Sequence, residues 1–533
     1  MRDGVRLLSN VYLPFDHGQF PCILVRTPYG KGLDITAHYQ AFVERGYAVM
    51  VQDVRGRYES EGAFQPLTQE PADGDDTINW IARQPWSNGR VGMMGGSYVG
   101  IVQWKAAQVN NPHLKAIFPV VSGYDDYRDR FYSTGGAMKL GNRLQWMSEN
   151  LRAPGYHLDF GKFVLHLPTR TSDITALGWT SPMYQEIVAH PSFDGFWRAI
   201  STREQLDRIK VPVFSVGGWY DNFVESDLAA FSVLNQKSSV NRILIGPWAH
   251  NMSTPFEDVD FGADSSAPIR QLQMEWFDQW LMGKDSPLLS KPPVKVFVMG
   301  ANKWRESREW PPEGSAARLF YLESRGKANS LAGDGALSEK QGAGAADQFV
   351  FDPDSPVPTH GGAVCCNPKV FPWGPMDQRL VESRRDVLVY TTRPLQRDVE
   401  AIGPVQVVLY VATSARDTDF TAKLVDVFPD GRARNLTDGI LRLRYRNSLE
   451  KPELAKPGEV YRIAIDAGVT GNVFLKGHRI RVEISSSNFP RFDRNPNSGG
   501  KVSDAAKLNK ASQSVYHDAK HPSALVLTVV PKG

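Results

Sequence analysis

Apolar runs alternate with amphipathic segments along the first third of the chain. The segments "PCILVRTPYG" (21–30), "YAVMVQDVRG" (47–56) and "RVGMMG" (90–95) indicate short buried strands. Between them, "ITAHYQAFVERG" (35–46) and "DGDDTINWIARQ" (73–84) have the spacing of helices. Strands that alternate with helices in this way predict a mostly parallel sheet covered by helices on both faces.

The pattern changes after residue 125. From about 125 to 205 the segments are helical and rich in aromatic residues, and apolar strand-like runs return at 211–223 and 241–251. Because sheet-forming segments flank this helical block on both sides, we expect it to be an insertion in an α/β domain.

The second half of the chain has a third pattern. Residues 327–346 are rich in Gly, Ala and Ser and are expected to form a surface loop. The segments that follow are typical of a β sandwich or jelly roll: "DVLVYTT", "VQVVLYVAT", "FTAKLVDVF", "YRIAIDAG", "HRIRVEISSS" and "SALVLTVV". The predicted fold class is α/β, with an α/β core over 1–124 and 206–314, a helical cap over 125–205 and a β jelly-roll domain over 315–533.

Composition and charge narrow the function class. The chain has 533 residues, too many for one core, and its 61 basic and 58 acidic residues leave a net charge of only +3. Without basic runs or a long apolar stretch, we expect no nucleic-acid partner and no membrane segment. The N-terminus lacks the apolar core of a signal peptide, which favours the cytoplasm. A secreted or periplasmic protein with a trimmed leader stays open, as does a homo-oligomer.

Cysteine usage argues against a metal or disulfide scaffold. The three cysteines are Cys22 and the adjacent pair Cys365 and Cys366, which do not make a disulfide framework. Without spaced histidine partners they also make no recognisable metal site. No metal and no other cofactor is therefore expected.

A serine between glycines is the first candidate for chemistry. The stretch "MMGGSYVG" places Ser97 at a strand end, with Gly95 two residues before it. In α/β hydrolases the nucleophile occupies such a strand-to-helix turn, where neighbouring residues must be small. The second glycine is Gly100, at plus three, and Val99 stands where the usual motif has glycine. Since Gly and Ser are common in turns, a plain helix cap is the alternative.

The rest of a catalytic set follows in α/β-hydrolase order. Asp221 comes directly after the strand in "VGGWYDNF", and His250 follows the next strand in "LIGPWAH". In these positions His250 would take the Ser97 proton and Asp221 would orient the imidazole. The backbone N–H of Tyr98 and the hydroxyl of Tyr29, in "RTPYGKG", are the candidate oxyanion donors. For Tyr29, simple packing beneath the site is the alternative.

Several longer segments carry a family resemblance. They are "MRDGVRL", "RTPYGK", "QDVRGRYESEG", "GGSYVG", "GWYDNF", "GPWAH", "GGAVCCN", "DTDFTAKLVDVFPDGRA" and "KGHRIRVEISSSNFPRFDRNPN". On these segments the chain resembles the CocE/NonD family of serine hydrolases. That family includes cocaine esterases, α-amino acid ester hydrolases and glutaryl-type cephalosporin acylases, with X-Pro dipeptidyl-peptidases as more distant relatives. The resemblance covers nearly the whole chain, including the glycine at plus three.

The resemblance implies a fold and a set of roles. It implies an α/β-hydrolase core, an inserted helical cap and a C-terminal jelly roll, and it treats the paired cysteines as a family feature rather than a redox centre. It assigns the triad and oxyanion roles to the residues already named. Matching the cap segment to the family also places Phe131 and Trp146 at acyl-pocket positions, with Phe223 at a third. Plain cap packing is the alternative for these aromatic residues.

Departures from the family narrow the expected substrate. The α-amino acid ester hydrolases carry acidic residues shortly after the triad aspartate, which bind the substrate ammonium. Here "DNFVES" has Phe223 and Val224 in those places, and Glu225 is displaced. We therefore expect a small-molecule ester, or an activated amide, with a neutral or aromatic acyl group, cleaved through an acyl-enzyme.

Two other functions stay open. One is an acylase or peptidase acting on β-lactam side-chain amides or X-Pro peptides. For a glutaryl carboxylate, the candidate partners are Arg128 and Arg130, although arginines in a cap are usually solvated. The other is a carbohydrate-binding protein with an inactive hydrolase domain.

Overall fold

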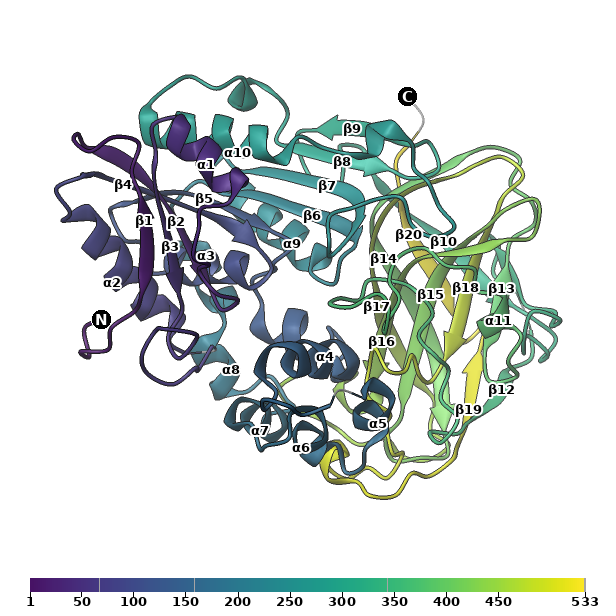
Figure 1. Ribbon diagram of the computed structural model, residues 1–533. Coiled ribbons are helices and arrows are strands. Elements are labelled where there is room, and N and C mark those ends of the chain that lie inside the picture. Colours follow the sequence, from purple (N-terminus) through teal and green to yellow (C-terminus); the bar gives the residue numbers. More distant parts are fainter. Residues whose placement is uncertain (67, 158, 343, 532–533) are drawn as a thin grey trace.

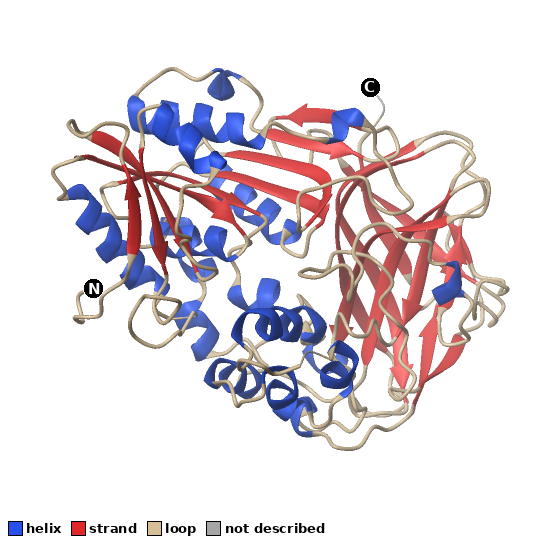
Figure 2. Ribbon diagram, viewed as in Figure 1, coloured by secondary structure: helices blue, strands red, loops and turns tan. Residues whose placement is uncertain are grey.

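Two sheets and a group of helices make up the molecule. The computed structural model describes residues 1–66, 68–157, 159–342 and 344–531. In Figure 1 the N-terminal sheet and the C-terminal sheet stand at opposite sides, and the helices from the middle of the chain lie against both. Figure 2 shows that helices cover the N-terminal sheet, whereas the C-terminal half consists almost wholly of strands and loops.

The N-terminal sheet is parallel in its centre and antiparallel at its edges. Its strands in the described chain run in the order β1-β3-β2-β4-β5-β6-β7-β8-β9. Only the edge strands β1 and β9 pair antiparallel with their neighbours. The bounds are β1 (Ser9–Tyr12), β2 (Phe20–Thr27), β3 (Ala48–Asp53), β4 (Ser87–Gly96), β5 (Leu114–Val120), β6 (Phe214–Tyr220), β7 (Arg242–Ala249), β8 (Val294–Val298) and β9 (Lys303–Ser307).

Helices pack on both faces of this sheet, as the sequence predicts. They are α1 (Ala37–Glu44), α2 (Glu70–Ala82), α3 (Tyr98–Ala107), α9 (Val224–Asn235) and α10 (Ile269–Phe277). The strands supply two separate apolar clusters, one around Leu24 and Met93 and the other around Ile23 and Val25. Because successive side chains of a strand point to opposite faces, two clusters mean that both faces are buried.

The cap occupies the interval between β5 and β6. The described chain forms helical segments there and no strand: η1 (Asp126–Phe131), α4 (Leu140–Leu151), α5 (Phe160–Leu165), η2 (Thr169–Thr171), α6 (Ser172–Leu177), α7 (Pro182–Ala189), α8 (Gly195–Ile200) and η3 (Thr202–Arg208). Buried apolar residues of the cap share one cluster with α3 and with strands β2 to β4. The predicted domain limits at 124, 205 and 314 stay predictions.

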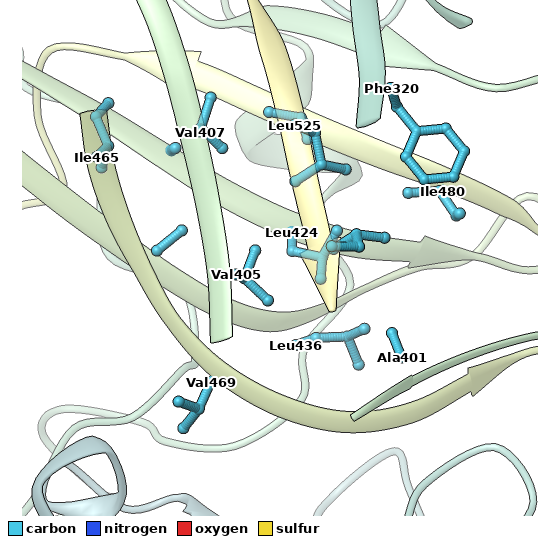
Figure 3. Packing of buried hydrophobic residues seen from close by; sticks show 14 of the residues in the cluster. Phe320, Ala401, Val405, Val407, Leu424, Leu436, Ile465, Val469, Ile480 and Leu525 are labelled. Atoms are coloured by element: carbon cyan, nitrogen blue, oxygen red, sulfur yellow. The ribbon is translucent and has the colours of Figure 1, made fainter. Parts of the chain in front are cut away.

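The C-terminal sheet folds around its own core. Its strands follow the order β12-β19-β14-β20-β10-β11-β13-β18-β15-β16, and β17 pairs with β14. Figure 3 shows side chains such as Val407 and Ile465 packed in the same cluster as Leu424 and Ile480. The bounds are β10 (Ala316–Glu323), β11 (Ala336–Ser338), β12 (Asp347–Phe351), β13 (Leu388–Thr391), β14 (Val399–Thr413), β15 (Asp419–Val427), β16 (Ala433–Arg442), β17 (Tyr461–Phe474), β18 (Arg479–Ser485), β19 (Ala511–Tyr516) and β20 (Ala524–Val529).

One sequence-based expectation for this half is partly wrong. Within the predicted loop of 327–346, residues Ala336–Ser338 form β11, which pairs with β10. The side chain of Leu337 is buried there, so a single apolar residue in a Gly-rich stretch adds a short strand to the sheet. Strands β10, β12, β16 and β19 also form beyond those predicted. None of the helices in the described ranges has the length and apolar character needed to cross a membrane.

Candidate active site

Ser97 lies on a sharp turn between β4 and α3. Its backbone has a φ of 57° and a ψ of −127°, which is unusual for a residue other than glycine. A strained backbone of this kind persists only where the surroundings hold it, and it is frequent at active sites. Ser97 occupies the N-cap position of α3, but its side chain makes no capping bond to that helix.

Two glycines make the turn sterically feasible. A Cβ atom on Gly95 would lie 2.2 Å from Cγ1 of Val99, and one on Gly100 would lie 2.5 Å from Cβ of Ser122. Glycine at minus two thus accommodates Val99, and glycine at plus three lets α3 pack against the chain after β5. The departure from the usual glycine spacing therefore leaves the turn intact.

A chain of hydrogen bonds links Ser97, His250 and Asp221. Nε2 of His250 is 3.0 Å from Oγ of Ser97, and Nδ1 of His250 is 2.6 Å from Oδ2 of Asp221. The Asp221 side chain is fully buried, and its other oxygen accepts the backbone N–H of Phe223 at 3.0 Å. Because Nδ1 faces a carboxylate, it carries the ring proton and leaves the Nε2 lone pair for the serine.

A second buried carboxyl group, that of Asp227, lies close enough to Asp221 to feel its charge. Asp227 accepts the backbone N–H of Gly123 at 3.2 Å. Burial, and after it the charge of Asp221, raises the pKa of Asp227 well above its usual value. The raised pKa favours the neutral form of Asp227, because burial and the Asp221 charge both disfavour a second negative charge there.

The two oxyanion candidates have different surroundings. Tyr98 is the first residue of α3, so its backbone N–H has no acceptor within the helix. The Tyr29 hydroxyl accepts the indole N–H of Trp146 at 3.1 Å, which leaves its own proton free to donate. Tyr29 is 38% exposed and is not among the residues that line the pocket beside Ser97.

A pocket opens beside Ser97 and is built from every part of the molecule. The aromatic residues Phe131 of η1, Trp146 of α4 and Phe223 all line it, and the Tyr98 ring stacks on Trp146 with centroids 6.1 Å apart. Its other described lining residues are Pro66, Ile101, Arg130, Arg143, Met183, Cys365 and Cys366. The structure therefore brings all three predicted acyl-pocket residues to the candidate nucleophile.

The adjacent cysteines form a disulfide bond with each other. The expectation that the cysteines make no framework holds in the sense that this bond closes no loop between distant segments, and Cys22 is buried and free. What the sequence did not indicate is the location of the pair. Cys365 and Cys366 belong to the C-terminal half, yet they form part of the pocket wall beside Ser97.

The charged residues considered for substrate binding differ in whether they line the pocket. Arg128 binds Asp125 at 2.8 Å and is not among the described pocket-lining residues. Arg130 does line the pocket and is only 5% exposed, so the expectation that cap arginines are solvated is wrong for it. This part of η1 packs on α3, since Phe131 shares an apolar cluster with α3 residues and Asp126 binds Lys105 of that helix. Arg143, which sequence reasoning missed, lines the pocket as well.

Glu225 is not among the described residues that line the pocket. Its carboxylate lies next to Gly468 of β17.

A second Ser-His-Asp group lies in the C-terminal domain. Nε2 of His517 is 2.8 Å from Oδ2 of Asp347 and 3.1 Å from Oγ of Ser324. Ser324 and Tyr390 each donate to the same carboxylate oxygen at 2.7 Å. All of these side chains are buried, and Nδ1 of His517 has no hydrogen-bond partner among the described residues.

Known proteins resemble this chain over its full length. Cocaine esterase from Rhodococcus sp. strain MB1 Bresler is 39% identical over 564 residues, which cover 100% of this chain and 97% of that protein. The chain belongs to the CocE/NonD family of hydrolases. Two family models match this CocE/NonD hydrolase as well. One, described as X-Pro dipeptidyl-peptidase (S15 family), matches residues 3–252, and the X-Pro dipeptidyl-peptidase C-terminal non-catalytic domain matches residues 289–526.

Solved structures agree with the fold of this CocE/NonD hydrolase. An α-amino acid ester hydrolase superimposes with a TM-score of 0.84 at 27% identity, covering 99% of this chain and 95% of that one. An aminopeptidase from a marine sediment Thaumarchaeota archaeon superimposes with a TM-score of 0.85 at 27% identity, covering 100% and 95%. The fold is thus an α/β-hydrolase core followed by a C-terminal β domain. Ser97, Asp221 and His250 all fall within the first family match.

Proposed function

We propose that this protein hydrolyses carboxylic esters through an acyl-enzyme, with Ser97, His250 and Asp221 as the catalytic triad. The observation that carries the proposal is the hydrogen-bond chain from Ser97 through both nitrogens of His250 to buried Asp221. The strained turn under Ser97 and the family's cocaine esterase support the same conclusion.

In the proposed mechanism each step is carried out by a named group. Oγ of Ser97 attacks the ester carbonyl carbon while Nε2 of His250 takes its proton, and Asp221 stabilises the imidazolium that forms. The carbonyl oxygen becomes an oxyanion, which the Tyr98 N–H and the Tyr29 hydroxyl stabilise. The C–O bond to the leaving alcohol then breaks, and the alkoxide takes the proton from His250. A water molecule, deprotonated by the same nitrogen, then attacks the acyl carbon. The bond to Oγ of Ser97 breaks, the acid leaves, and Oγ recovers the proton from His250.

The acyl group packs against the aromatic wall. Phe131, Trp146 and Phe223 present flat apolar surfaces next to Ser97, which favour an acyl group with a planar or apolar body. No aspartate or glutamate stands among the described lining residues of this pocket. An aminoacyl ester or an X-Pro peptide would need a carboxylate for its ammonium group, so the lining disfavours both.

A covalent probe tests the proposal directly. A fluorophosphonate reacts with activated serines, and we expect peptide mass spectrometry to find its adduct on Ser97 and nowhere else. Hydrolysis of 4-nitrophenyl esters should be lost when the probe has reacted. The Ser97→Ala variant should neither react nor hydrolyse, whereas the matched Ser324→Ala variant should do both normally. A folded wild-type protein without labelling at Ser97 would overturn the triad assignment.

A further inference from the structure

A buried arginine without an acidic partner lines the pocket next to Ser97. Arg143 of α4 is 8% exposed and makes no ion pair with any described residue. Its Nε and Nη2 donate to the backbone carbonyl of Arg130 at 3.3 and 3.1 Å, and Nη1 donates to no described atom. The guanidinium carbon lies 4.7 Å from the ring centroid of Phe131 and 5.5 Å from that of Trp146. Two aromatic side chains of the acyl pocket therefore hold this guanidinium in place.

The surrounding charges do not compensate for it. Arg130 binds Asp126, but Lys105 binds the same carboxylate at 2.5 Å, so one acid serves two buried cations before Arg143 is counted. Glu70 is already occupied, since it accepts from Arg26 at 2.6 Å. This side of the pocket thus holds more positive than negative charge, in a wall that contains no described acidic residue.

An uncompensated buried charge needs a physical reason. Burial, and secondly the charge of Arg130, lowers the pKa of Arg143 to about 9, so it is still protonated at neutral pH. Removing a guanidinium from water without an anionic partner is unfavourable, and natural proteins rarely keep one without use. Arginine binds carboxylates through paired N–H donors, and the Arg143 side chain lines the pocket that already contains the candidate nucleophile.

We propose that the acyl group of the substrate carries a carboxylate, which Arg143 binds, with Arg130 adding positive charge. The substrate class is a half ester, or activated half amide, of a dicarboxylic acid: its apolar body packs on Phe131 and Trp146 and its free carboxylate reaches Arg143. This inference rests on the proposed esterase function. It differs from the sequence-based expectation of a neutral or aromatic acyl group, which rested on Phe223 and Val224 standing where relatives carry acidic residues.

Matched ester pairs test the inference. Mono-4-nitrophenyl esters of succinic, glutaric, adipic and terephthalic acid would be compared with the same compounds methylated on the free carboxylate. Each pair has the same leaving group and nearly the same shape, so kcat/KM within a pair reports the charge. For the best-fitting pair we expect the wild type to favour the charged member at least about tenfold, mainly through a lower KM.

Variants separate recognition from packing. Arg143→Gln should raise KM for the charged ester at least about tenfold and leave kcat/KM for its methylated partner within about twofold. Arg143→Lys should retain part of the preference, since it keeps the charge but not the planar donors. Arg128→Gln is the control, because that arginine is paired with Asp125 away from the pocket.

The outcomes are distinguishable. Wild-type preference for every methylated ester would overturn the inference while leaving the esterase proposal standing. Equal losses on both members of a pair in Arg143→Gln would assign Arg143 a packing role and also overturn it. If Arg143→Gln does not fold, glutarate binding to Ser97→Ala by calorimetry decides: binding supports the inference, and no binding, together with no charge preference in the wild type, overturns it. Failure of fluorophosphonate labelling would instead overturn the esterase proposal.

Discussion

The described part of the chain contains two Ser-His-Asp groups, one in each half, and they differ in which nitrogens of the histidine make hydrogen bonds. In the α/β core, His250 places Nδ1 on Asp221 and Nε2 on Ser97, so its two nitrogens face two different partners. In the β domain, His517 places Nε2 on both Asp347 and Ser324, while Nδ1 has no partner among the described residues.

This difference decides which serine can be a nucleophile. A nitrogen that donates its proton to a carboxylate cannot accept a proton from a serine at the same time. His517 therefore offers Ser324 no basic lone pair, and Ser324 donates to Asp347 instead. Ser324 is also buried, whereas Ser97 borders a pocket. The same three residue types thus form the proposed catalytic group in the α/β core and a buried polar network in the β domain.

Removing each serine should give the largest contrast. We expect Ser97→Ala to lower kcat for a 4-nitrophenyl ester by at least about 10⁴-fold, because no other group can form the acyl-enzyme. Its free energy of unfolding should stay within about 1 kcal/mol of the wild type. Ser324→Ala should hydrolyse the ester at the wild-type rate. Steady-state kinetics and urea unfolding check both, and loss of activity in Ser324→Ala alone would reverse the assignment.

Replacing Asp221 or Asp347 should separate the two Ser-His-Asp groups in the same way as replacing the serines. Asp221→Asn should lower kcat by about 10³- to 10⁴-fold, since the amide no longer holds the His250 tautomer or stabilises the imidazolium. Asp347→Asn should leave kcat unchanged in the protein that remains folded. Kinetics on purified, folded samples, checked by circular dichroism, measure this. A small effect of Asp221→Asn would mean that another group orients His250.

A catalytic Ser-His-Asp group needs a hydrogen-bond donor for the oxyanion, whereas the buried group of the β domain does not. Tyr29 is the side chain that tests this difference. Tyr29→Phe should lower kcat by about 10²-fold or more if its hydroxyl stabilises the oxyanion, with KM changed much less. The variant keeps the ring and loses only the oxygen that accepts from Trp146. An unchanged kcat would remove Tyr29 from the mechanism and leave it a packing role.

The β-domain group should show its effect in stability and in its response to acid. Burial raises the pKa of Asp347, but hydrogen bonds from His517, Ala328 and Ser324 outweigh this, so the pKa lies below the ordinary value of an aspartate. A lowered folded pKa means that this stabilisation is present above about pH 4 and is lost as the pH falls below it. Asp347→Asn should lower the free energy of unfolding by about 1–3 kcal/mol at pH 7. The variant should also lose less stability than the wild type when the pH is lowered. Urea unfolding at pH 7 and pH 3.5 measures both, and equal wild-type stability at the two pH values contradicts this account.

Much of the core was predictable because its signals are local. Strands and helices of the first third follow from apolar spacing, and the triad follows from chain order, since each candidate comes right after a parallel strand. The carboxyl ends of parallel strands meet at one edge of a sheet, so residues in those loops converge wherever the chain forms that sheet. The short strand β11 escaped prediction because one buried leucine in a Gly-rich segment is too weak a local signal.

The sequence by itself therefore determined the α/β core, the β-rich second half and the candidate triad. Only the tertiary structure decided what surrounds Ser97. Packing of the cap and the β domain against the core brings Arg143 and the Cys365–Cys366 pair to the same pocket, from segments more than 200 residues apart. It also decided that Arg143 is buried with no acidic partner among the described residues while Arg128 is paired, although the two are near neighbours in the same cap. Burial and pairing depend on contacts between distant segments, and local spacing carries no information about them.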